Sequence, residues 1–124
     1  MVSKAIHKYA LIAPRKVRRV TNLIKGKKAG DALITLKFLP HRSARVVTKI
    51  LKSAMANAEQ KKVADPEGMK IVKAVVDQGP VMKRMMPRAM GRSDIIRKRM
   101  SHITLILEEV GSEKLEICSI KYGL

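Results

Sequence analysis

Residues 79–102, GPVMKRMMPRAMGRSDIIRKRMSH, form a basic segment that separates two apolar runs of the sequence. The flanking runs, residues 69–77 and 103–110, are rich in β-branched residues and predict two antiparallel strands of one sheet. A Gly-Pro pair marks the base of the connection, and Gly91 gives the backbone freedom for a turn at its tip. The pattern therefore predicts a hairpin with arms of about ten residues, which at about 3.3 Å per residue reach about 30 Å from the sheet.

Such a hairpin has no core of its own to hold it together. An isolated two-stranded ribbon of this length is marginally stable in water. The segment also carries seven Lys and Arg residues against one acid, Asp94. We expect an external polyanion to order it, because packed RNA supplies phosphates to both faces. A flexible basic loop is the alternative interpretation of the same composition.

The distribution of charge gives the chain two basic regions. Its 124 residues hold 27 Lys and Arg against 10 Asp and Glu, a net charge of +17. Residues 1–58 account for +13 and residues 81–102 for +6, whereas residues 59–80 are neutral and residues 103–124 carry −2. Self-repulsion of this size destabilises a compact state unless counter-charge is near, and nucleic acid is the usual polyanion.

Aromatic residues are scarce, which limits the kind of RNA recognition that the chain can perform. Tyr9, Phe38 and Tyr122 are the whole set. Single-strand binders and sequence-reading RNA modules stack bases on aromatic platforms, and this chain cannot build one. We therefore expect contacts to phosphate, to ribose and to the shape of folded RNA.

The N-terminal half reads as one strand followed by three helices. Partial alternation predicts the strand over residues 4–12, and helical spacing predicts helices over residues 14–25, 29–38 and 41–61. Pro14 suits a first helical turn, Gly26 suits a C-terminal stop, and Pro40 ends the second helix. The stripes expected to face the core comprise Val17, Val20 and Ile24 in the first helix, and Ser43, Val47, Ile50, Leu51, Ala54 and Ala58 in the third.

Cations occupy the helix faces opposite these stripes. In the third helix they form a row at steps of three, four and three residues, namely Arg42, Arg45, Lys49 and Lys52. Almost no acid is interspersed, so like charges at neighbouring helical positions repel without relief. A solvated helix surface and a phosphate-binding surface are both open interpretations of this row.

The chain offers little for catalysis. His7, His41 and His102 are spread along the sequence without a paired carboxylate at ligand spacing, so neither a metal site nor a catalytic triad is indicated, and no cofactor is expected. His102 suits a hydrogen bond or an RNA contact better than general-base catalysis. A single cysteine, Cys118, suits a reducing compartment, and no signal peptide or membrane span is predicted. We expect a cytoplasmic protein that is not an enzyme.

Three separated motifs carry a family resemblance. The runs APRKVRRVTNLIKGKKAGDAL, KSAMANAE and GPVMKRMMPRAMGRSDIIRKRMSHITLIL are similar to those of the ribosomal large-subunit protein twenty-two family, in order, over about residues 6–110. The resemblance implies an α+β fold with three helices on a three-stranded antiparallel sheet and a long protruding hairpin. We expect one domain over residues 1–124, with the hairpin at 79–102 and a tail of unassigned role at 111–124.

The resemblance also implies a function. A structural constituent of the large ribosomal subunit is expected, which binds large-subunit rRNA and lines the nascent-peptide exit tunnel with its hairpin near the macrolide site. The implied partners are rRNA, neighbouring large-subunit proteins and the nascent peptide, with no membrane and no homo-oligomer.

Motif position and the charged helix faces together select the candidate residues. The expected RNA-binding set is Arg15, Lys16, Arg18, Arg19, Lys25, Lys27, Arg42, Arg45, Lys49, Lys52, Lys83, Arg84, Arg88, Arg92, Arg97, Lys98, Arg99 and His102. The expected tunnel-lining tip is Pro87, Arg88, Ala89, Met90, Gly91 and Arg92.

Three positions depart from the usual pattern of the family. Met90 stands where Lys is frequent, Ile95 where Arg is frequent, and Arg97 where an apolar residue is commoner. Two other classes of protein remain open on the residues alone. A DNA architectural protein could use Met86 and Pro87 as minor-groove wedges. A membrane-active basic protein is disfavoured by the absence of Trp and the single Phe.

Overall fold

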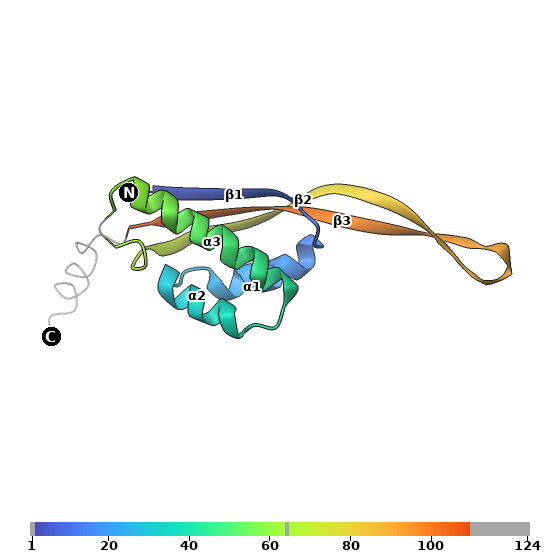
Figure 1. Ribbon diagram of the computed structural model, residues 1–124, viewed down its shortest axis with the longest axis horizontal. Coiled ribbons are helices and arrows are strands. Elements are labelled where there is room, and N and C mark those ends of the chain that lie inside the picture. Colours follow the sequence, from blue (N-terminus) through green and yellow to red (C-terminus); the bar gives the residue numbers. More distant parts are fainter. Residues whose placement is uncertain (1, 64, 110–124) are drawn as a thin grey trace, which may run out of the picture.

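The computed structural model describes residues 2–63 and 65–109. In chain order the elements are β1 (Val2–Ala10), α1 (Pro14–Ile24), α2 (Ala29–Phe38), α3 (Arg42–Gln60), β2 (Lys70–Pro87), a one-turn 3-10 helix η1 (Ala89–Gly91) and β3 (Ser93–Glu108). The strands form one antiparallel sheet in the order β1-β3-β2. Figure 1 shows the three helices gathered on one side of the sheet, with β2 and β3 continuing past them as a long twisted hairpin. The predicted α+β fold is confirmed.

The core lies between the helices and one face of the sheet. On β3, alternate residues Ile103, Leu105 and Leu107 are fully buried, as period-2 alternation requires. Both predicted helical stripes are buried against them, including Val17 on α1 and Leu51 on α3. The spacing of apolar residues therefore fixed the helix orientations, because only those faces can leave water.

The connection between α1 and α2 covers the outer edge of β2. Gly26 has a positive φ of 82°, in keeping with its expected role as a helix stop, and its N–H donates to the carbonyl of Ile71 at 2.8 Å. The N–H of Ile71 in turn donates to the carbonyl of Lys27, and Ala29 N–H donates to Met69. These bonds satisfy backbone groups that an exposed edge strand would leave open.

Strand β1 is displaced from the predicted range and carries an irregularity. It spans Val2–Ala10 rather than residues 4–12, and its pairing with β3 shifts register between His7 and Ala10. Tyr9 has a φ of 58°, and its backbone N–H donates to Nδ1 of His102 at 3.0 Å. The alternation read from the sequence breaks at this bulge, because the extra residue turns the following side chains to the other face.

The hairpin is a direct continuation of the sheet rather than a separate connection between two short strands. A register shift between Gln78 and Val81 marks its base, and pairing then runs from Val81 opposite Arg99 to the tip. Met100 and Ser101, which follow Arg99 in the predicted hairpin, are buried in the sheet. We call residues 81–99 the arm, and the rest of the described structure the body.

Two expectations fall outside the described residues. These are the end of the last strand at residue 110 and the short strand at residues 115–120. No helix of the described structure is both long enough and apolar enough to cross a membrane.

Candidate nucleic-acid interface

The predicted RNA-binding cations share one property, which is exposure. Every Lys and Arg of the set is exposed, and only His102 is half-buried. The predicted tip, residues 87–92, is exposed throughout. The fold therefore keeps these side chains available for a partner, although exposure alone does not identify one.

A few of these cations have partners inside the chain. The guanidinium of Arg18 donates twice to the carbonyl of Val76, through Nε at 3.2 Å and Nη2 at 2.9 Å, and so ties α1 to β2 below the arm. Lys27 Nζ lies 3.4 Å from the hydroxyl of Thr35. Arg84 donates to the neighbouring carbonyl of Lys83, and Arg88 has an acidic partner at the tip. The other cations of the set have no hydrogen-bond or ion-pair partner among residues 2–63 and 65–109.

His102 also has a place within the fold. Its Nδ1 accepts the Tyr9 N–H, and the two rings meet edge to face with centroids 4.9 Å apart. Nδ1 is therefore occupied as an acceptor, which leaves Nε2 as the ring nitrogen available to an outside partner. Its assignment as an RNA contact remains a prediction.

The arm presents cations on both faces. Side chains opposite each other in an antiparallel pair share a face. Lys83 lies opposite Arg97, and Arg99 is two residues further on the same face. Arg84 and Lys98 belong to the other face. Like charges placed directly opposite destabilise a ribbon, and Lys83 and Arg97 form such a pair. On the other face Arg84 and Lys98 lie opposite apolar residues and are diagonal neighbours. Both faces of the arm therefore offer cations to external counter-charge.

The tip has a defined shape. The N–H of Arg88 donates to the carbonyl of Arg92 at 2.8 Å, and Arg88 Nε lies 3.0 Å from Oδ2 of Asp94. Between them Met90 and Gly91 both have left-handed backbone conformations, with φ of 60° and 69°. The sequence predicted a turn at the glycine and missed the left-handed conformation of Met90, whose side chain is 95% exposed.

The body and the arm meet in a basic depression, which we call the base hollow. Its volume is about 580 Å³. The lining residues are Leu11, Ala13, Arg42, Met82, Arg84, Arg97, Lys98 and Arg99. The hollow therefore joins the two basic regions of the sequence, since Arg42 belongs to the first and the other four cations to the second. Lys25 and Lys27, at the opposite end of α1, lie outside it.

Sequence reasoning missed the apolar part of this hollow. Leu11, Ala13 and Met82 line it, and none of the three carries a charge that would mark a nucleic-acid contact, although Ala13 and Met82 fall within the motifs of the family resemblance. The signal that could have found them is their position along the chain. Leu11 and Ala13 shortly precede the first helix, and Met82 lies near the Gly-Pro pair at the base of the predicted hairpin.

The fold and the distribution of cations define a small basic α+β protein with a projecting β-ribbon. The family of ribosomal protein L22p/L17e matches residues 5–108, and the chain belongs to this family. The large ribosomal subunit protein uL22 of Thermoanaerobacter sp. (strain X514) is 52% identical over 109 residues, which are 88% of this chain and 98% of that protein.

Two further relatives agree. The protein of the same name from Desulforamulus reducens is 50% identical over 88% of this chain and 96% of its own length. That from Aquifex pyrophilus is 52% identical over 90% of this chain and 84% of its own length. The family resemblance read from the motifs is confirmed. Membership in a ribosomal protein family supports a structural, non-enzymatic protein that is associated with the ribosome in the cytoplasm.

Proposed function

We propose that this protein is a structural constituent of the large ribosomal subunit that binds large-subunit rRNA through phosphate and shape contacts. The base hollow carries the proposal. Arg42 of α3 stands there with four cations of the arm, and no carboxylate is among the lining residues. Such a group of cations repels itself in isolation, and an RNA backbone supplies the missing negative charge.

The helix faces extend the same surface. Arg45, Lys49 and Lys52 continue from Arg42 along the exposed side of α3, opposite the buried stripe. Neither α1 nor α3 has an acid in its first turn, so no internal carboxylate competes for these cations there. The body is therefore expected to anchor the protein on rRNA.

The arm is expected to thread between rRNA segments and to line the nascent-peptide exit tunnel near the macrolide site. Cations on both of its faces support contact with RNA on two sides. The tip, with the exposed Met90 at its end, is the part furthest along the arm from the body. The partners in this proposal are rRNA, neighbouring large-subunit proteins and the nascent peptide, with the chain present as a single copy.

The test is a filter-binding titration of the full chain with folded large-subunit rRNA and with duplex DNA at matched salt. We expect tighter binding to rRNA. We also expect the logarithm of affinity to fall against the logarithm of salt concentration with a slope of about −4 or steeper, because the five cations of the base hollow contribute about 0.7 to 0.9 each. A slope near zero, or equal affinity for DNA as an architectural protein would show, contradicts the proposal.

A further inference from the structure

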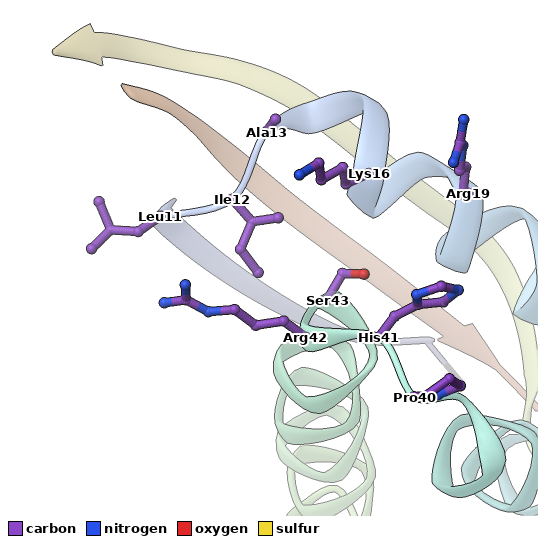
Figure 2. Close-up of a pocket in the computed structure, with 9 residues that line it drawn as sticks. All are labelled: Leu11, Ile12, Ala13, Lys16, Arg19, Pro40, His41, Arg42 and Ser43. Carbon is purple, nitrogen blue, oxygen red and sulfur yellow. The ribbon is translucent and has the colours of Figure 1, made fainter. Parts of the chain in front are cut away.

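A second pocket lies where the starts of α1 and α3 meet the loop that follows β1. Its volume is about 460 Å³, and we call it the helix-start pocket. Figure 2 shows Lys16 extending beneath α1, with His41 and Ser43 on the first turn of α3 facing the same space. Arg42 extends from the rim of the pocket on the side away from His41. No carboxylate is among the lining residues, all of which belong to the described structure.

Both helices begin at this pocket without a capping side chain. The N-cap residues are Ala13 for α1 and His41 for α3, and neither makes a side-chain capping hydrogen bond. In α3 the N–H of Ala44 donates to the carbonyl of His41. Helix geometry leaves the N–H groups of Arg42 and Ser43 without an acceptor inside the helix. The positive ends of two helix dipoles therefore lie at one pocket with no acid in either first turn.

Ser43 provides an independent sign of a ligand. The sequence placed it in the buried stripe of the helix, and it is indeed only 5% exposed. It nevertheless lines the pocket, and Figure 2 shows its hydroxyl directed into the space between α1 and α3. No residue among 2–63 and 65–109 forms a hydrogen bond with this hydroxyl. The hydroxyl oxygen itself opens onto the pocket, because the only fully buried side-chain oxygen without a partner in the described structure is that of Ser101. An outside acceptor in the pocket can therefore reach the Ser43 hydroxyl and take up its unused hydrogen bond.

The chemistry of the pocket selects the ligand. Free backbone N–H groups, a hydroxyl and cationic side chains are all donors, and together they suit a compact anion with several acceptor oxygens. We propose that the helix-start pocket binds one backbone phosphate of RNA, through Ser43 and the first-turn N–H groups of α3, with Lys16 as a cation of the lining. This inference rests on the proposed rRNA-binding function and names the point at which the body holds the strand.

The position of the pocket supports RNA as the source of the phosphate. The helix-start pocket and the base hollow share three lining residues, Leu11, Ala13 and Arg42. An RNA strand bound in one depression can therefore continue into the other next to Arg42, and from there can reach the cations of the arm. An isolated inorganic phosphate can occupy either depression, whereas only a chain of linked phosphates can occupy both at once.

The test compares two serines of the same helix in the full chain. Ser43→Asp places a carboxylate in the pocket, whereas Ser53→Asp makes the same charge change at an exposed position of α3 outside it. We expect Ser43→Asp to weaken rRNA binding by about tenfold or more and to lower the salt slope by about one, because one phosphate contact is lost. Ser53→Asp should weaken binding by less than about threefold, because it lies outside the pocket and acts only through its neighbours in the cationic row, Lys49 being one helical turn away.

Inorganic phosphate is the second probe. Titrated into the ¹⁵N-labelled chain, it should shift the amide resonances of Arg42 and Ser43, and Ser43→Ala should reduce those shifts while keeping the fold. If Ser43→Asp fails to fold by circular dichroism, the comparison of Ser43→Ala with wild type replaces it. Equal rRNA affinities of the two aspartate variants would overturn the proposal, even with amide shifts present, because the phosphate would then not be that of RNA.

The same experiments separate this inference from the proposed function. If wild-type protein shows no preference for rRNA, the proposed function fails whatever the pocket does. In that case amide shifts with inorganic phosphate would still support a phosphate pocket, and their absence at Arg42 and Ser43 would overturn it.

Discussion

In the body, cations stand on helices whose opposite faces are buried, whereas in the arm they stand on strands with no buried face. Leu51 of α3 is fully buried, and the cationic row of the same helix is exposed. In the arm every side chain from residue 83 to residue 95 is exposed, including the apolar Met85 and Ile95. The cations of the body therefore stand on elements that are stabilised by their own buried core. Those of the arm stand on strands that have no such core.

This difference means that the stability of the fold and the binding of a partner depend on different residues in the body, but not in the arm. The body derives its stability from apolar burial, so its cations can be changed without loss of the fold. The arm opposes its own repulsion with cross-strand hydrogen bonds, a hydrogen bond from Arg84 to the carbonyl of Lys83, and the Arg88–Asp94 ion pair, and an exposed ion pair contributes little. Its order in the assembled particle is expected to come from the partner.

The largest expected effect compares two apolar residues of the same strand, β3. Leu105→Ala empties a fully buried site in the body and should lower the free energy of unfolding by about 2 to 5 kcal/mol. Ile95→Ala in the arm, where the side chain is 67% exposed, should change it by less than about 0.5 kcal/mol. Urea unfolding of both full-length variants, followed by circular dichroism, measures the difference. A comparable loss for Ile95→Ala would show that the arm packs onto the body.

The body could be predicted from the sequence because its elements repeat a simple period. Val17, Val20 and Ile24 recur at helical spacing, and all are buried as that spacing requires. The arm could be predicted from its charge and its flanking apolar runs. So many cations cannot be buried in a small core, so the segment between the two predicted strands must project into solvent or onto a partner. In both cases a local pattern and a global constraint point to the same structure.

Features that depend on distant contacts could not be predicted in this way. The bulge at Tyr9 follows from pairing with β3 and a hydrogen bond to His102, which lies far along the chain. The helix-start pocket exists because two helix starts, separated by α2 and its flanking loops, meet in space. Ser43 belongs to the buried stripe by periodicity alone, and only its place at the first turn gives its hydroxyl a second role.

The next largest effect removes the tip. Deleting residues 86–91 leaves Arg92, Ser93 and Asp94 to connect the paired residues Met85 and Ile95. The deletion leaves the body and its proposed rRNA-binding surface untouched, so the melting temperature and incorporation into the large subunit should remain close to wild type. If the tip lines the exit tunnel as proposed above, macrolide inhibition of translation should change severalfold, because the deletion shortens that wall.

Two measurements check this variant. Occupancy is assayed in purified large subunits, and macrolide inhibition is then measured with the same particles. Normal occupancy with unchanged inhibition would place the tip away from the drug end of the tunnel. Loss of the shortened protein from the large subunits would contradict the assignment of the body as the anchor, since the arm would then be the part that holds the protein in place.

The smallest effect lies at the boundary between the two regions. Ser101 pairs with Gln78 at the base of the arm, is fully buried, and has a hydroxyl without a hydrogen-bond partner in the described structure. Ser101→Ala removes that unsatisfied group and should raise the free energy of unfolding by about 0.5 to 1 kcal/mol. The matched control is Ser93→Ala in the exposed arm, which should leave it unchanged, and urea unfolding measures both. A loss of stability in Ser101→Ala would mean that the hydroxyl is satisfied in solution, and that the base of the arm is organised by a polar contact rather than by packing alone.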